Sequence, residues 1–242
     1  PNTNISGGGC YFLGDRNYDG LCTFENVIRG ERIRLLRRLD EYEIFIRYNT
    51  ALSIVHKVVN HRGFSSLSDL VSTRNVFGLA SSVRGTQHQD AEHSLQVYTS
   101  GGLGWIEEES VAIGTPLIDR YKVFMGKVLS GHLGETDEQG LVKVIATIHV
   151  ANPKDVCTDS YLVIGGFVTR EEALNLAAYL KTKTLRYLLL QALASMNISR
   201  GNFRFVPVLD FTKSWTDERL YDRFGFTGEE IATIEQAIKA IN

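Results

Sequence analysis

Basic side chains gather in one stretch of the sequence, where they could bind phosphate groups. Residues 174–209 contain five basic residues and no acidic residue, a local charge of +5; the basic residues are Lys181, Lys183, Arg186, Arg200 and Arg204. Polar and aromatic residues such as Asn197, Tyr179 and Tyr187 lie among them. Cations in this pattern are typical of surfaces that contact a nucleic-acid backbone. The alternative is a solvated helix face whose cations offset the helix dipole.

Acidic residues elsewhere in the chain offset the positive charge of this basic stretch in the total. The 242 residues carry a formal net charge of −2 at pH 7. From residue 210 onward, seven acidic residues stand against four basic residues, a balance of −3. The near-neutral total therefore does not exclude an anionic partner, because the positive charge is concentrated in one segment.

Other reactive groups do not form a recognisable site. Asp15, Asn17, Asp19 and Gly20 match the opening of a calcium-binding EF-hand loop, but its twelfth position is Asn26 and not the required glutamate. A polar turn is therefore expected there, with calcium binding as the alternative. The six histidines and three cysteines show no metal-ligand spacing. The sequence predicts no catalytic residue and no metal ligand, and leaves open whether the chain is an enzyme.

The elements that position these residues indicate an α+β fold, with a mixed β-sheet domain at 1–209 and a helical C-terminal extension at 210–242. Apolar runs and alternation predict strands at 95–99, 105–107, 122–125, 142–149, 161–164 and 203–208, a strand bias at 43–47, and a hairpin joining 10–13 to 21–24. Apolar residues at helical spacing predict a helix over 49–60, and the segment 130–140 is expected to be a mobile loop.

Helix-capping patterns organise the C-terminal third. Thr169 and Thr227 are each followed three residues later by a glutamate, which is the capping-box pattern at a helix start. The apolar stripe of the first of these helices changes register near 181–184, so we expect two helical segments to meet there.

Composition narrows the class of protein. Hydrophobic residues make up 43% of the chain and charged residues 22%, which excludes disorder, collagen and a disulfide scaffold. No run approaches the roughly 20 apolar residues of a membrane-spanning helix. Three sparse cysteines suit a reducing, cytoplasmic compartment. Pro1 fits either removal of an initiator methionine or a boundary within a longer protein.

Three groups of short motifs follow one another along the chain. The first joins Gly-Gly-Cys-Tyr-Phe-Leu at 8–13 to Asp-Arg-Asn-Tyr-Asp-Gly at 15–20, the second runs from 157–165 through 171–173 to 179–183, and the third runs from 203–207 through 210–211 and 215–221 to 224–227. Weaker matches lie at 72–79 and 101–106. Together they resemble the C-terminal, TaqI-like target-recognition region of restriction–modification DNA adenine methyltransferases, including fused restriction–methylase enzymes.

The resemblance implies a sequence-specific double-stranded DNA recognition domain, partnered by an upstream catalytic methyltransferase domain that binds S-adenosylmethionine. The catalytic Asn/Asp-Pro-Pro-aromatic loop is not matched, because Asn152-Pro153-Lys154-Asp155 lacks the second proline and the aromatic residue. No cofactor is therefore expected in this chain, and Pro1 is interpreted as a cut boundary. Gly14 stands where the family usually has tryptophan, which puts the packing of that segment in question.

A recognition domain supplies phosphate contacts that hold the duplex and base contacts that choose the site. Under the resemblance, the candidate DNA-binding residues are Arg74, Lys122, Lys127, Lys181, Lys183, Arg186, Asn197 and Arg200. Arg74, beside Ser72 and Asn75, is the base-edge candidate, because arginine pairs bidentately with guanine; a loop salt bridge is its alternative. Two other functions remain open: an unrecognised nuclease or methyltransferase site, and a protein-interaction module of a restriction complex.

Overall fold

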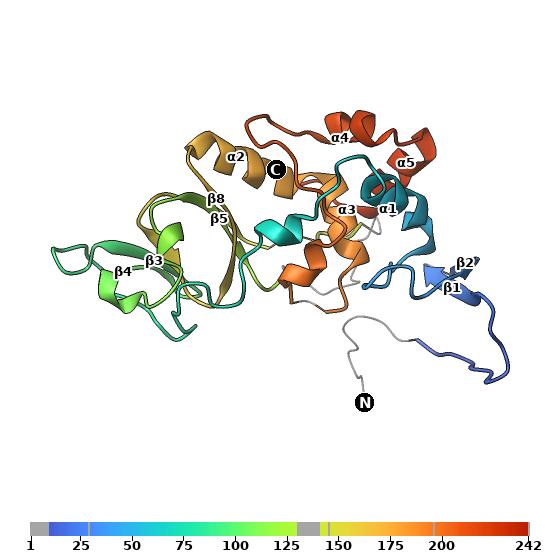
Figure 1. The fold of residues 1–242 in the computed structure, drawn as a ribbon, viewed down its shortest axis with the longest axis horizontal. Helices are drawn as coiled ribbons and strands as arrows, with labels where there is room; N and C mark the ends of the chain where they lie inside the picture. The colour runs from blue at the N-terminus through green and yellow to red at the C-terminus, as the bar shows by residue number, and fades with distance from the viewer. Residues whose placement is uncertain (1–9, 29, 130–140, 145, 196, 242) are drawn as a thin grey trace.

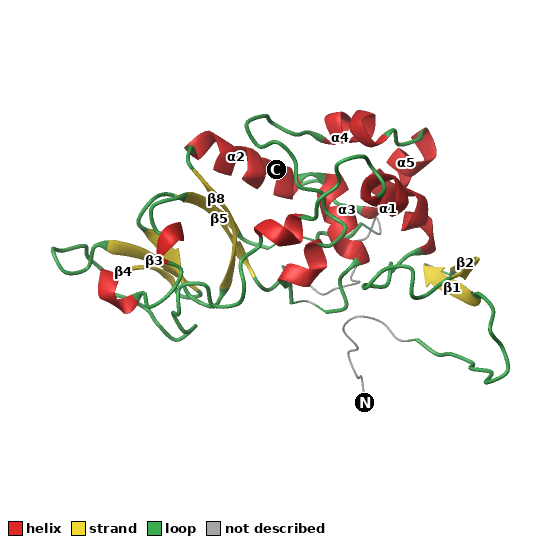
Figure 2. Cartoon of the chain, viewed as in Figure 1, coloured by secondary structure: helices red, strands yellow, loops and turns green. Residues whose placement is uncertain are grey.

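The computed structural model describes residues 10–241 except 29, 130–140, 145 and 196. It contains both helices and strands, which confirms the α+β class (Figure 2). The strands form three small sheets instead of one: a two-stranded sheet, β1-β2, and two three-stranded sheets with the orders β4-β3-β7 and β6-β5-β8. The expected mobile loop at 130–140 and the two glycines that open the 8–13 motif lie outside the described residues.

The β6-β5-β8 sheet is the central layer of the fold. Its strands are β6 (Ile148–Ala151), β5 (Tyr121–Gly126) and β8 (Tyr161–Phe167), and β5 pairs antiparallel with both neighbours. Successive side chains of a strand point to opposite faces. Val123 and Met125 accordingly lie in a large core, whereas Phe124 lies in a smaller one. Both faces are covered, which is why β5 is buried at four successive positions, from Lys122 to Met125.

The β4-β3-β7 sheet covers one face of the central sheet. It consists of β4 (Gly102–Ile106), β3 (Leu95–Thr99) and β7 (Asp155–Cys157), and β3 pairs antiparallel with β4 but parallel with β7. Val97 and Val156 meet Phe124 and Val163 in the smaller core. The expected strands at 95–99, 122–125 and 161–164 are confirmed, whereas β7 was not predicted.

Helices α2 (Arg170–Lys181) and α3 (Lys183–Gln191) help to form the large core on the other face (Figure 1). The predicted capping box of α2 is confirmed: Thr169 and Glu172 each bond to the other's backbone N–H. Thr182 ends α2 and caps α3, since its hydroxyl accepts a hydrogen bond from the Leu185 amide. The predicted change of helix near 181–184 is therefore confirmed, and its cause is this shared threonine.

Three further helices pack on the same core. They are α1 (Leu52–Val59), α4 (Asp217–Phe224) and α5 (Gly228–Ala237), and α5 begins at the predicted Thr227 capping box. A short 3-10 turn, η1 (Asn49–Ala51), precedes α1, so the expected helix over 49–60 is confirmed. Leu220, Phe224 and Ile234 are buried in the large core. Residues from 210 onward thus share one core with α2 and α3.

The β1-β2 hairpin lies at the end of the molecule opposite to β4 (Figure 1). It pairs β1 (Cys22–Ile28) antiparallel with β2 (Glu31–Arg37), and Gly30 takes a positive φ of 83° in the turn. The expected hairpin between 10–13 and 21–24 was wrong, because 10–20 contain no strand. The Asp-Asn-Gly signal at 15–20 does form a turn, with Tyr18 N bonded to Asp15 O at 3.2 Å, but no strand follows from it.

Two other expected strands are absent from the described residues. Residues 43–47 form no strand, with bends at 43, 44 and 47. Residue 203 ends a 3-10 turn, η5 (Arg200–Phe203), and residues 204–208 contain only an isolated bridge, between Pro207 and Ser66. Phe205 and Val206 are both buried, so this segment lacks the alternation of a half-exposed strand. Of the expected strand at 142–149, only its end belongs to a strand, β6. The remaining 3-10 turns are η2 (Leu67–Leu70), η3 (Glu108–Ser110) and η4 (Thr115–Leu117).

Candidate nucleic-acid interface

The segment that carries Arg74 is fixed to the central sheet from both sides. Before Arg74, the Ser72 amide donates to the Val163 carbonyl at 2.8 Å, and the Val163 amide donates to the Ser72 hydroxyl at 3.2 Å. After Arg74, the Asp159 amide donates to the Leu79 carbonyl at 2.9 Å. These backbone contacts hold Arg74 and Asp159 in register with each other and with β8.

Asp159 joins two of the candidate residues. Its Oδ2 accepts a hydrogen bond from Arg74 Nε at 2.9 Å, and its Oδ1 accepts one from Lys127 Nζ. The Arg74 side chain is 85% exposed, whereas the carboxylate is only 14% exposed and Lys127 20%. One nearly buried anion therefore holds two cations, one of which extends into solvent.

The electrostatics of Asp159 favour its charged form. Burial raises the pKa of its carboxyl, but the hydrogen bonds and charges of Lys127 and Arg74 outweigh burial and keep the pKa below its usual value. The carboxylate is therefore ionised at neutral pH, and the cluster of two cations and one anion has a charge of +1.

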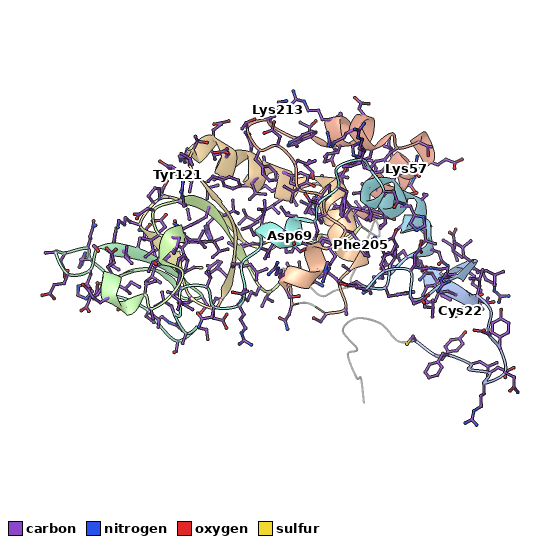
Figure 3. The ribbon with its side chains drawn as sticks, viewed as in Figure 1. Cys22, Lys57, Asp69, Tyr121, Phe205 and Lys213 are labelled. Atoms are coloured by element: carbon purple, nitrogen blue, oxygen red, sulfur yellow. The ribbon has the colours of Figure 1, made fainter. Side chains whose placement is uncertain are left out.

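Asn197 and Arg200 continue this surface. Asn197 bridges to Val128, and the next amide, that of Ile198, donates to the Lys127 carbonyl at 2.7 Å. Arg200 Nε donates to the Ser68 carbonyl of η2 at 2.8 Å, and its guanidinium lies 3.7 Å from Asp69. Figure 3 marks Asp69 on η2, next to η5. We call Arg74, Lys127, Asp159, Asn197 and Arg200 the Arg74 surface.

The remaining residues of the basic stretch lie elsewhere: Arg204 pairs with Glu43 at 2.7 Å, and Lys183 lies where the acidic C-terminal segment meets α3. Lys183 Nζ bonds to Glu235 of α5, and the amides of Lys183 and Thr184 donate to Asp217 of α4 at 2.9 and 2.8 Å. Lys181 is exposed at the end of α2. Part of the positive charge of the basic segment is thus neutralised within the molecule, because acidic residues of the C-terminal segment form an ion pair with it and cap its helix.

Arg186 is a correction to the predicted phosphate contacts. Its side chain is buried, with 1% exposure of the residue. Its guanidinium donates to the carbonyls of Lys181 at 3.0 Å and Lys239 at 2.8 Å. Burial lowers the pKa of Arg186 to about 10, which leaves it charged at neutral pH. A guanidinium enclosed by carbonyls cannot reach a phosphate, so Arg186 holds the C-terminal segment in place.

Lys122 is a second correction. The residue is fully buried, and its ammonium donates to the carbonyls of Ile118, Arg120 and Asn152 at 3.2, 2.9 and 3.0 Å. Lys122 alternates with Val123 along β5 and faces the smaller core, so the strand itself directs it inward. It ties the chain before β5 to the chain after β6 and cannot contact DNA from this position.

Asp159 is the member of the surface that sequence reasoning missed. It lies within the quoted motif at 157–165, but it follows Arg74 by 85 positions and Lys127 by 32. No local pattern connects residues at such separations. The only signal was an acidic residue between two hydroxyl residues in a strand-to-strand turn, a pattern that many turns share.

No protein-family model matches this chain, and no curated protein matches it. The described residues contain no group of three or more His, Cys, Asp or Glu side chains that could hold a metal ion. No helix in the described ranges is long and apolar enough to cross a membrane.

Proposed function

We propose that this chain is a sequence-specific double-stranded DNA-binding domain and that the Arg74 surface is its DNA contact. The observation that carries the proposal is the Arg74–Asp159–Lys127 cluster, in which a rigidly anchored loop presents an exposed guanidinium. Arginine with this exposure is the residue type that most often reads guanine in the major groove. Lys127, Asn197 and Arg200 extend the polar surface on which phosphates can be bound.

The biological setting follows from the motifs at 8–20, 157–183 and 203–227. They support a role as the target-recognition domain of a restriction–modification adenine methyltransferase acting in the cytoplasm. In such an enzyme a separate catalytic domain binds S-adenosylmethionine and flips the target base, and the recognition domain supplies contacts that offset the cost of flipping.

Binding of the 242-residue chain to a fluorescent duplex pool, randomised over its central positions, tests the proposal. Anisotropy should show binding that weakens steeply with salt, and selection from the pool should enrich one sequence. Arg200→Ala should weaken binding to all duplexes alike and reduce the salt slope by about one. Lys213→Ala is the matched control, since Lys213 is an exposed lysine, 3.7 Å from Asp210, on a different part of the surface (Figure 3).

The outcomes are separable. Absent or salt-insensitive binding would reject the DNA-binding proposal. Binding without sequence enrichment would reject its sequence-specific part. Equal losses for Arg200→Ala and Lys213→Ala would show that DNA binds elsewhere on the chain.

A further inference from the structure

Arg74 and Arg38 are two exposed arginines that pair with aspartates in different ways. Arg38 uses both Nε and Nη2, which donate to Asp40 at 3.1 and 2.9 Å. Arg74 gives only Nε to Asp159, because the second carboxylate oxygen is taken by Lys127. Within the described part of the chain, Nη1 and Nη2 of Arg74 have no hydrogen-bond or ion-pair partner. The two pairs are equally short but leave different donors available.

We propose that Asp159 is a positioning residue that fixes Arg74 so that its two terminal nitrogens read a guanine in duplex DNA. Guanine presents two acceptors, O6 and N7, in the major groove, and a guanidinium matches them with two parallel N–H donors. An arginine held at Nε keeps this pair of donors directed away from the protein. The inference rests on the proposed DNA-binding function and names the base that the site recognises.

Preorganisation is the physical reason for such an arrangement. An exposed arginine has many rotamers, and fixing it on binding costs side-chain entropy. Asp159 is fixed by its backbone bond to Leu79, and its other oxygen is fixed by Lys127. The guanidinium is therefore held at one end before DNA arrives, so less entropy is lost when the other end binds.

The local backbone supports a specialised role for this loop. Asn75, directly after Arg74, has a positive φ of 53°, a left-handed conformation that asparagine adopts more readily than most residues with a side chain. Its Oδ1 is buried without a hydrogen-bond partner. The two ends of the loop are bonded to Val163 and Asp159, and these bonds hold the backbone on both sides of Arg74.

The test compares the enriched duplex with the same duplex in which single guanines are replaced by 7-deazaguanine, which lacks the N7 acceptor. For the wild-type chain, one such exchange should weaken binding about tenfold. Arg74→Lys should bind the two duplexes equally well, because lysine keeps the charge but lacks the two-donor fork. Asp159→Asn should lose most of the discrimination, because affinity for the guanine duplex falls toward that for the 7-deazaguanine duplex, whereas binding to the 7-deazaguanine duplex should not weaken, since a negative charge has been removed.

In Asp159→Asn, the preference for guanine and the overall affinity for DNA report on different roles of the carboxylate, positioning and electrostatic. If Asp159 acted through its charge only, Asp159→Asn would bind every duplex more tightly and keep the tenfold preference for guanine. Asp40→Asn is the matched control, and it should change neither affinity nor discrimination. Lys127→Met should weaken binding to both duplexes and reduce the discrimination, because the freed Oδ1 of Asp159 can then take a terminal nitrogen of Arg74, as Asp40 takes Nη2 of Arg38.

Thermal melting of each variant shows whether it is folded. If Asp159→Asn unfolds, Arg74→Lys still tests the guanine contact, because it leaves the Asp159 carboxylate in place. An enriched duplex in which no guanine responds to 7-deazaguanine, or full discrimination in Asp159→Asn, would overturn the inference while leaving sequence-specific binding intact. Absence of DNA binding by the wild-type chain would instead reject the proposed function itself.

Discussion

Asp217 and Thr184 are joined through one carboxylate oxygen: Asp217 Oδ1 accepts hydrogen bonds from both the amide of Thr184, at 2.8 Å, and its hydroxyl, at 2.6 Å. The second oxygen accepts from the Lys183 amide at 2.9 Å. Asp217 is in the first turn of α4, while Lys183 and Thr184 begin α3. An acidic residue of the C-terminal segment thus satisfies two of the amides that every helix leaves free at its start.

Replacement of Asp217 by alanine should destabilise the fold. The first turn of α3 would lose the acceptor for two backbone amides and a favourable negative charge, and Thr182 would remain as its only side-chain cap. We expect the free energy of unfolding to fall by about 2 kcal/mol, measured as a lower urea midpoint. Asp222→Ala, at an exposed site on the same helix, should change it by less than about 0.5 kcal/mol. Equal midpoints for the two variants would contradict the assigned cap.

Arg186→Met separates stability from DNA binding in the basic stretch. The substitution removes the guanidinium that connects α3 to Lys239, and the carbonyls of Lys181 and Lys239 lose this donor. We expect a loss of about 2–4 kcal/mol in the free energy of unfolding. At a temperature where the variant is still folded, its affinity for duplex DNA should match that of the wild type. A selective loss of DNA affinity in a fully stable variant would restore Arg186 as a phosphate contact.

The position of Arg186 also illustrates what the sequence could predict. The capping boxes at Thr169 and Thr227 and the apolar run of β5 were readable, because a cap depends on residues three apart and a strand on its own side chains. Arg186 lies among Leu185, Leu188 and Leu189, all buried, so its neighbours carried a signal for burial that the charge count ignored. Lys122, within the apolar run of β5, carried the same signal.

Other features depended on contacts between distant segments and were not readable. The hairpin turn at Gly30 competes with the richer Asp-Asn-Gly signal at 15–20, and only packing decides between them. Glu25 of β1 faces Arg34 of β2 and forms ion pairs with Arg34 and Arg32, each at 3.0 Å. The charged residues of β2 are therefore stabilised by the strand with which β2 pairs. The Asp159–Arg74 pair likewise exists only after β8 and the 72–79 segment have met.

Asn49 should prove to be the residue that attaches the hairpin to the rest of the fold. Its buried amide nitrogen donates to the carbonyls of Phe24 at 3.0 Å and Ile33 at 2.8 Å, and its oxygen accepts from Arg37 at 3.2 Å. Asn26 and Arg37 also connect the hairpin to Arg47 and Ile46, but the Asn49 side chain bonds to both of its strands, so Asn49→Ala should release it locally. Amide hydrogen exchange over residues 22–37 should become about tenfold faster or more, while exchange in α2 and α3 stays the same.

The matched control is Asn60→Ala, at an exposed asparagine at the end of α1, which should leave exchange in the hairpin unchanged. Uniformly faster exchange across the whole chain in Asn49→Ala would contradict a local role. It would place the hairpin in the same cooperative unit as the helices.

The buried ammonium of Lys122 should make stability depend on pH in the alkaline range. Burial lowers the pKa of Lys122 from 10.5 to about 8, although Asp155 and other nearby anions partly oppose the shift. The folded protein therefore releases this proton more readily than the unfolded chain. The contribution of Lys122 to stability is lowest below pH 8 and rises as the pH increases toward 10.5.

Lys122→Met removes this titration. The difference in the free energy of unfolding between wild type and Lys122→Met, measured by urea titration from pH 7 to pH 10, should shift in favour of the wild type, by up to about 3 kcal/mol. The difference cancels the tyrosines and other groups that titrate in both proteins. A constant difference across this range would mean that the three carbonyls of Ile118, Arg120 and Asn152 stabilise the ammonium enough to cancel the effect of burial.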